Sequence, residues 1–151
     1  MKYSMKNPRQ QRTLTMITVI LVVIVGVVSS CLRSDGEDPG YLSFHNEGYL
    51  TIRDASGTAA VVYYTDMKEV AFFEEADFGT ADTGEIVEQT YRLGRWNSPQ
   101  LGSYLSCTRT DVAACVRIRT DQDIYVINLE SGETTRALYD AILKAQNELK
   151  G

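Results

Sequence analysis

Histidine, cysteine and tryptophan are scarce in this sequence, which contains one, three and one of them among 151 residues. A Ser-His-Asp or Cys-His catalytic device would have to use His45, and the G-x-S-x-G motif of a serine nucleophile does not occur. No C-x-x-C pair accompanies the single histidine, so we expect neither a zinc site nor any other cofactor. Three cysteines are also too few for a disulfide-built scaffold. These scarcities predict a protein without catalytic activity.

Positive charge is scarce beyond residue 32. Residues 33–151 contain 20 acidic and 11 basic side chains, a net charge of −9, whereas the whole chain has a formal net charge of −5. Binding of nucleic acid needs a concentrated basic face, and so does attraction to anionic lipid headgroups. We therefore expect residues 33–151 to bind neither nucleic acid nor anionic lipid headgroups. This part of the chain is long enough to form one domain with its own core.

One long apolar run, residues 14–32 (LTMITVILVVIVGVVSSCL), carries no charge. A helix that crosses the hydrocarbon core of a bilayer needs about 20 such residues. Residues 1–13 carry only positive charge, and acidic residues begin soon after the run. The positive-inside rule therefore predicts a basic cytoplasmic tail at 1–13 and places residues 33–151 outside the cytoplasm.

The end of the apolar run allows two kinds of membrane attachment. Its length and the lack of an A-x-A cleavage site favour a signal anchor that stays in place as a transmembrane helix. Alternatively, Val28-Ser29-Ser30-Cys31 resembles the lipobox of bacterial lipoproteins, with Val28 where leucine is usual. Cys31 would then be the lipidated first residue of the mature protein. Both alternatives hold the domain at the outer side of a bacterial membrane.

The remainder of the chain has the pattern of β-strands. Residues 33–40 (RSDGEDPG) are acidic and interrupted by glycine and proline, as expected of a solvated tether. Beyond them, runs rich in Val, Ile, Tyr and Phe alternate with turn residues. We expect a meander of four strands at 41–45, 48–53, 59–65 and 68–74, and a second meander of three strands at 103–109, 113–120 and 124–129.

Two other segments interrupt or end this pattern. Residues 75–100 contain several glycines and a proline, which predicts a long loop with a short strand at 86–91, and loops of this length are often functional. Near the C-terminus, Ser131 can cap a helix that has Glu133 in its first turn. Apolar residues then recur at helical spacing, so we expect an amphipathic helix packed on the sheets. They are Leu138, Ile142, Ala145 and Leu149.

This order of four strands, a loop, three strands and a helix resembles the pleckstrin homology (PH) fold. Residues 101–142 (LGSYLSCTRTDVAACVRIRTDQDIYVINLESGETTRALYDAI) are similar to the bacterial PH-like domain family of small membrane-attached proteins. Residues 67–75 (MKEVAFFEE) are similar to the strand that precedes the long loop of that family. The resemblance covers about residues 41–149, in a chain that has one apolar segment where many relatives have two.

The resemblance implies a mainly β domain at 41–151 with a C-terminal helix. Its expected form is a barrel of two orthogonal antiparallel sheets, with about seven strands, capped by the helix. It also implies a binding or assembly module without catalytic activity. The phosphoinositide-binding motif of eukaryotic relatives is not implied, because the first hairpin offers only Arg53 as a basic residue.

Two sets of residues are candidates for a disulfide and for a cation site. In an antiparallel hairpin centred on Asp111, Cys107 and Cys115 would face each other and could form a disulfide. A register shift of one residue would instead leave two buried thiols. Carboxylates in the 75–100 segment offer the oxygen ligands that Ca²⁺ prefers, although their spacing is not that of an EF-hand and they can equally be solvated. They are Asp77, Asp82 and Glu85.

A basic and aromatic set near the end of the same segment is the candidate ligand-binding site. It comprises Arg92, Arg95, Trp96, Arg117 and Arg119. These side chains could bind an anionic headgroup or an acidic peptide. The alternative is that the arginines pair with carboxylates of the same chain, and such surface pairs contribute little stability.

We therefore predict a membrane-tethered bacterial PH-like module, without catalytic activity, that binds a protein or peptide partner or assembles with itself. The alternatives are an extracytoplasmic lipoprotein of another function, a calcium-dependent adhesion module and a small hydrolase. The hydrolase would use carboxylates of residues 74–88, and it would need two acids that converge in a cleft with raised pKa values.

Overall fold

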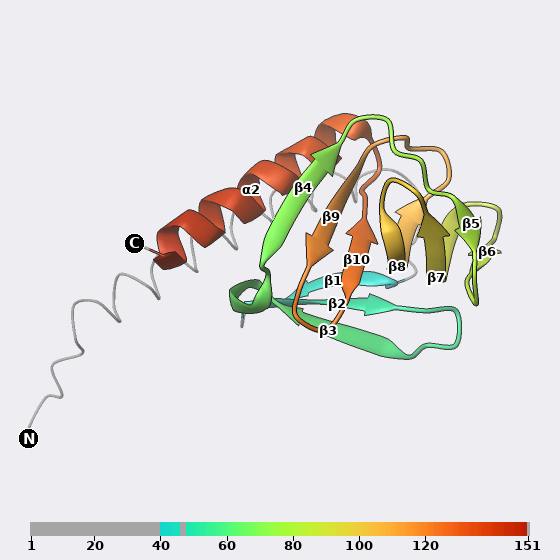
Figure 1. The fold of residues 1–151 in the computed structure, drawn as a ribbon, viewed down its shortest axis with the longest axis horizontal. Coiled ribbons are helices and arrows are strands. Elements are labelled where there is room, and N and C mark those ends of the chain that lie inside the picture. The colour runs from blue at the N-terminus through green and yellow to red at the C-terminus, as the bar shows by residue number, and fades with distance from the viewer. Residues whose placement is uncertain (1–39, 46–47, 151) are drawn as a thin grey trace, which may run out of the picture.

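The computed structural model describes residues 40–45 and 48–150 (Figure 1). The predicted basic tail, the apolar run with Cys31, and residues 33–39 of the predicted tether lie outside the described residues. Within the described ranges, no helix is both long enough and apolar enough to cross a membrane.

Most of the described chain is β-structure, followed by one C-terminal α-helix. The elements are β1 (Leu42–His45), β2 (Tyr49–Arg53), β3 (Ala59–Tyr63), the short 3₁₀-helix η1 (Tyr64–Asp66), β4 (Glu69–Phe73), β5 (Thr80–Ala81), β6 (Glu85–Val87), β7 (Tyr91–Ser98), β8 (Gly102–Arg109), β9 (Cys115–Arg119), β10 (Ile124–Ile127) and α2 (Gly132–Lys150). The mainly β class with a C-terminal helix is confirmed.

These strands form two sheets. The small sheet is the antiparallel meander β1-β2-β3, and the large sheet has the order β4-β9-β10-β8-β7-β5, with β6 also paired to β7. Strand β10 lies between β8 and β9, parallel to the first and antiparallel to the second. In Figure 1 the small sheet runs across the direction of β4, β9 and β10, and α2 lies beside β4.

The main core lies between the small sheet, one face of the large sheet and α2. Alternation along the strands buries Leu50 and Val62 of the small sheet, and it buries Ile118 of the large sheet on the facing side. From the helix, Leu138 and Ile142 are completely buried in the same core. Ala145 is 1% exposed, so three of the four predicted stripe residues are buried, and the side chain of Leu149 lies outside the described residues.

A second core covers the opposite face of the large sheet. There Phe78, from the segment between β4 and β5, packs with Trp96 and Tyr104 of β7 and β8. The Tyr104 hydroxyl donates a hydrogen bond to the Phe78 carbonyl oxygen. The segment lies so close to β7 that a Cβ on Gly79 would stand 2.0 Å from the Asn97 carbonyl oxygen. Glycine is required at position 79, also because its φ is +71°.

The prediction of a long loop at 75–100 is wrong, because the segment contains β5, β6 and the eight-residue strand β7. Strand β7 lacks the usual alternation of apolar and polar residues, because it contains several polar residues and Gly94 and only some of its side chains are buried. The short strand predicted at 86–91 spans the turn between β6 and β7. At that turn Glu88 and Gln89 have φ of 53° and 59°, the left-handed conformation of a tight hairpin.

The predicted barrel of about seven strands and both predicted meanders are also wrong, because the described residues contain ten strands and β4 pairs with β9 of the large sheet instead of β3. Within the described residues the two sheets do not close into a barrel, and the parallel pairing of β8 with β10 makes the large sheet mixed. Strand β9 pairs with β4 and β10 instead of β8. Local alternation identifies strands and their faces, but it does not identify their neighbours, so it does not predict the strand order.

Candidate binding surface

A row of three aromatic rings lies on the outer face of the small sheet. The rings come from His45, Tyr49 and Tyr63, which stand opposite one another in the strand register. The ring centroids of His45 and Tyr49 are 4.4 Å apart and stacked, and those of Tyr49 and Tyr63 are 5.3 Å apart. A hydrogen bond of 2.9 Å joins His45 Nε2 to Thr51 Oγ1. The single histidine is thus held as a strand side chain by its neighbours.

Beside this row, β3 presents an open edge. Within the described ranges β3 pairs only with β2. Hydrogen bonds from Tyr64 N–H to the Gly48 carbonyl and from Asp54 N–H to the Thr58 carbonyl set the alternation of this ladder. In an antiparallel pair every second residue bonds to the neighbour, so the backbone groups of Val61 and Tyr63 point away from β2.

The side chains at this edge are apolar and exposed. Val61 is 48% exposed and Tyr63 is 47% exposed, whereas Val62 between them points into the main core and is 2% exposed. The strand sequence AAVVY has none of the lysines, prolines or inward charges that commonly protect an edge strand. We call the outward backbone of Ala59–Tyr63, with the side chains of Val61 and Tyr63, the β3 edge.

A hollow separates the β3 edge from the turn between β9 and β10. Its volume is about 140 Å³. Pockets for small-molecule ligands typically measure about 300–1,000 Å³, so this hollow suits a single side chain better than a metabolite. The lining residues are Val61, Val62, Tyr63, Asp66, Thr120, Asp121, Gln122 and Tyr125.

Carboxylates give this hollow its charge. Asp66 and Asp121 are the two acidic residues that line it, and both residues are exposed. Lys68 Nζ lies 3.6 Å from Asp121 Oδ2, but the two side chains are 54% and 83% exposed. Exposed pairs of this kind contribute little, so Asp121 can exchange Lys68 for another cation. The sequence prediction missed this surface, since AAVVY also fits a strand covered by neighbours.

The predicted basic and aromatic set does not form one site. Arg95 projects on the side of β7 opposite to Arg92 and Trp96, because their positions alternate along the strand. Trp96 is buried, and its Nε1–H donates to the Leu93 carbonyl oxygen at 3.1 Å. The guanidinium of Arg92 lies 4.1 Å over the Phe78 ring and donates to the Arg109 carbonyl oxygen. Burial lowers the pKa of Arg92.

The other arginines of the set pair with carboxylates of strands and turns. Arg117 Nη2 lies 2.8 Å from Glu69 Oε1, and Arg119 Nη2 lies 3.2 Å from Glu69 Oε2. The hydrogen bond and charge of Arg117, with a smaller effect of Arg119, lower the pKa of Glu69. Arg95 forms a two-pronged pair with Asp123 of the β9–β10 turn. Intramolecular pairing therefore occupies Arg95, Arg117 and Arg119.

The carboxylates considered for calcium are not gathered into a metal site. Among residues 40–45 and 48–150, no three His, Cys, Asp or Glu side chains lie where they could hold a metal ion together. Asp77, Asp82 and Glu85 are exposed. Asp77 Oδ1 accepts the Gly79 N–H at 3.0 Å, so this side chain stabilises its own turn.

The predicted hairpin that would join Cys107 to Cys115 is absent, and both cysteines are buried and free of a disulfide. Cys107 points into the main core, whereas Cys115 points into the second core on the other face of the sheet. Strand β10 also lies between their strands. Two thiols on opposite faces of a sheet cannot meet, so the alternative of two buried thiols holds.

Neither buried thiol should react with alkylating agents while the domain is folded. Burial raises the pKa of Cys115 to about 12, although Arg117 and Arg92 oppose this shift, and the thiolate is the reactive form. We expect iodoacetamide at pH 8 to leave both Cys107 and Cys115 unmodified in the folded chain, and to modify both after denaturation without reductant. Peptide mapping by mass spectrometry measures this. Modification of Cys115 before unfolding, or a need for reductant, would contradict the structure.

The pair of Arg95 and Asp123 should make stability depend on pH. Burial raises the pKa of Asp123, but the hydrogen bond from Arg95, the Ile124 N–H and the charge of Arg95 outweigh it and hold the pKa below its usual value. Such a carboxylate stabilises the fold above its unfolded pKa of about 3.9 and loses that effect as pH falls. We expect Asp123→Asn to lower the free energy of unfolding by about 1 kcal/mol at pH 7, and by less below about pH 4.

Urea unfolding from pH 3 to pH 7 measures this difference. Asp121→Asn, in the same turn but 83% exposed, is the matched control and should change stability little at any pH. A difference between wild type and Asp123→Asn that grows as the pH falls would contradict the assignment.

Comparisons with protein-family models, with curated proteins and with solved structures find no match for this chain. Its class is therefore defined by the structure, as a mainly β domain of two sheets with one C-terminal helix. The PH-like resemblance stays a prediction from the sequence.

Proposed function

We propose that this chain is a membrane-tethered, PH-like binding module of a bacterium, without catalytic activity, that engages a protein partner at the β3 edge. The observation that carries the proposal is the edge itself. It combines a strand backbone that, among the described residues, pairs only with β2, and two apolar side chains that are about half exposed, Val61 at 48% and Tyr63 at 47%. A strand of this kind is a ready template for pairing with another chain.

Three further features support a binding role. The aromatic row of His45, Tyr49 and Tyr63 adjoins the β3 edge and offers flat apolar surface of the kind enriched in interfaces. The hollow beside the edge has the size of a side chain rather than of a metabolite. The uncharged run at 14–32 supports a membrane tether, which would hold the module at a fixed compartment.

Site-specific photo-crosslinking in the full chain, expressed in bacterial cells, tests the interaction surface. A photoreactive residue in place of Tyr63 is expected to yield a discrete crosslinked product. The matched control is the same residue in place of Ile86, which is 53% exposed but lies in β6 of the large sheet. The product from position 63 should disappear in a Val61→Pro background, because proline removes an outward N–H and blocks strand addition.

Equal products from positions 63 and 86, or none from position 63, would reject the proposed surface. Persistence of the product in the Val61→Pro background would reject the edge as its basis. Thermal unfolding of Val61→Pro is the folding control, since the substitution removes no hydrogen bond to β2.

Mass spectrometry of the mature N-terminus tests the tether. An intact N-terminal segment means a transmembrane anchor, and a diacylglyceryl group on Cys31 means a lipoprotein. A mature chain that begins beyond Cys31 without a lipid would reject membrane attachment.

A further inference from the structure

We propose that the β3 edge accepts an extended basic peptide from a partner protein. The peptide adds a fourth strand to the small sheet and places a lysine or arginine side chain in the hollow. This inference rests on the proposed function and specifies the chemistry of the partner.

The backbone of β3 determines the form of the partner. Val61 and Tyr63 direct their N–H and C=O groups away from β2, as the alternation of the ladder requires. An edge of this kind pairs with an extended strand, and the main-chain hydrogen bonds supply affinity that is independent of sequence. The partner segment is therefore a strand rather than a helix.

The outer face of β3 determines part of the side-chain pattern of the partner peptide. Val61 and Tyr63 both project to the outer face, and Tyr49 lies across the ladder from Tyr63 at a centroid distance of 5.3 Å. Residues on an added strand would lie next to these side chains at every second position. Apolar or β-branched residues at those positions would cover the exposed surface of Val61 and Tyr63.

The hollow determines the charge of the partner. Asp66 and Asp121 line it together with the polar side chains of Thr120 and Gln122. Lys68 Nζ lies 3.6 Å from Asp121 Oδ2, whereas Asp66 takes part in no ion pair with another described residue. Residues 33–151 carry a net charge of −9, so the wider field also favours a cationic segment.

A second copy of the chain is a poorer occupant. Pairing β3 with β3 of another copy would bring together two domains of the same strong negative charge. The strand itself, AAVVY, contains no lysine or arginine that could enter the hollow of the other copy. Charge complementarity therefore favours a basic strand from a different protein.

The test uses the full chain, purified in detergent, and a synthetic end-blocked peptide of eight residues in which valine alternates with lysine. Two matched peptides serve as controls, one with glutamate in place of lysine and one with N-methyl groups on every second amide. Fluorescence anisotropy measures affinity, and amide hydrogen exchange measures protection at Val61 and Tyr63. The variants are Val61→Pro and the double substitution Asp66→Asn/Asp121→Asn.

The lysine peptide is expected to slow exchange at Val61 and Tyr63, and to bind at least about tenfold more tightly than the glutamate peptide, as two ion pairs would give. The double substitution should remove most of that difference, and added salt should reduce it. The N-methylated peptide and the Val61→Pro variant should not bind, because each prevents the main-chain ladder.

Several outcomes would overturn this inference. Equal binding of the glutamate peptide would reject the basic partner, and equal binding of the N-methylated peptide would reject strand addition. Protection of Val61 and Tyr63 without peptide would assign the edge to a second copy if it increases with chain concentration, and to another segment of the same chain if it does not. No binding of any peptide, with crosslinking from position 63 intact, would reject the inference and leave the proposed function standing. Loss of both peptide binding and crosslinking from position 63 would reject both this inference and the proposed function.

Discussion

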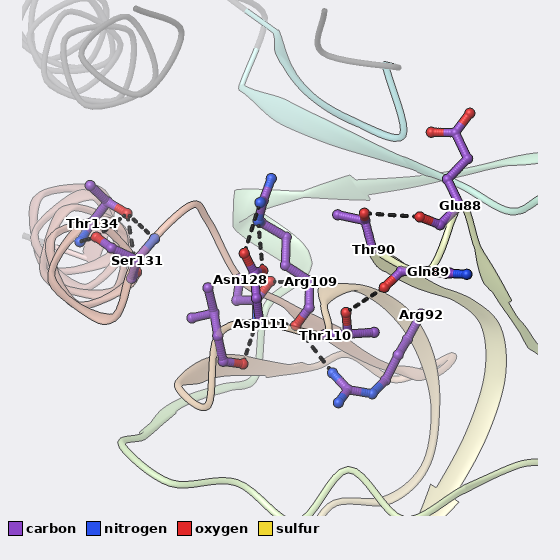
Figure 2. A network of polar contacts seen from close by, with 11 residues as sticks. Glu88, Gln89, Thr90, Arg92, Arg109, Thr110, Asp111, Asn128, Ser131 and Thr134 are labelled. Carbon is purple, nitrogen blue, oxygen red and sulfur yellow. Dashed lines mark hydrogen bonds and ion pairs between the residues drawn. The ribbon is translucent and has the colours of Figure 1, made fainter. Parts of the chain in front are cut away.

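Replacing Asn128 by alanine is expected to lower the free energy of unfolding by about 3 kcal/mol. Asn128 follows β10 and is 4% exposed. Its Oδ1 accepts the Arg109 N–H at 2.6 Å, and its Nδ2 donates to the carbonyl oxygens of Val112 and Ala114 at 3.3 and 3.1 Å. Figure 2 shows this side chain at the connection that carries the chain from β8 to β9.

The expected cost is large because the partners of Asn128 are main-chain groups, buried at Val112 and Ala114 and half-buried at Arg109. Alanine leaves these donors and acceptors unsatisfied, and each such group costs about 1–3 kcal/mol. The connection also depends on Thr110, whose N–H donates to the Thr90 carbonyl and whose hydroxyl donates to the Gln89 carbonyl. Loss of Asn128 should therefore speed amide exchange at residues 109–114 before global unfolding.

Urea unfolding with hydrogen exchange measures both effects. Asn97→Ala is the matched control, because Asn97 lies on β7 and is exposed, and its replacement should change stability by about 0.5 kcal/mol or less. If Asn128→Ala were as mild as Asn97→Ala, the connection would not depend on this side chain.

Replacing Gly79 by alanine is expected to displace the segment between β4 and β5 from the large sheet. The new Cβ would lie 2.0 Å from the Asn97 carbonyl oxygen and 2.6 Å from Ser98 Cβ, so the segment or β7 has to move. Alanine also disfavours the φ of +71° at this position. We expect the left-handed backbone and the overpacking together to lower the free energy of unfolding by about 3–5 kcal/mol.

The single tryptophan reports this change directly. Trp96 is 6% exposed beneath the segment, and it packs with Phe78 in the second core. Displacement of the segment should expose Trp96 to water and shift its fluorescence emission to longer wavelength. Gly57→Ala is the control, because Gly57 has a φ of +87° but no atom within 4 Å of the added Cβ.

Gly57→Ala should cost only about 1–2 kcal/mol, the penalty of the backbone conformation alone, with Trp96 emission unchanged. Equal losses in the two variants would show that the close approach of Gly79 to β7 contributes nothing. An unshifted Trp96 emission in a destabilised Gly79→Ala variant would show that the second core stays closed.

Much of the fold follows from local sequence pattern. The spacing of Leu138 and Ile142 predicts a helix with one buried stripe, and both side chains are completely buried. The β-rich runs predict β2 and β3 to within a residue or two, because side chains on a strand alternate between faces. The pattern does not predict β7, because its residues YRLGRWNS place glycine and two arginines in a strand that is paired on both sides.

The candidate site was predictable only in part. Arg117 and Arg119 share a face, as their spacing requires, but the acid that pairs with both is Glu69 of a strand far away in sequence. The disulfide prediction assumed that consecutive strands pair, and β10 between β8 and β9 makes that assumption wrong. No local pattern identifies the β3 edge, since a strand shows its edge only when the neighbours of the whole sheet are known.

The sequence by itself determined the parts whose physical cause is local. These are the positions of most strands, the buried face of the C-terminal helix and the net charge of −9 beyond residue 32. Only the tertiary structure decided the strand order, the second core beneath Phe78 and the position of β3 at the edge of the small sheet in the described part of the chain. These features depend on hydrogen bonds and contacts between segments that are far apart in the chain. Which segments pair depends on the free energy of the whole fold and not on local sequence.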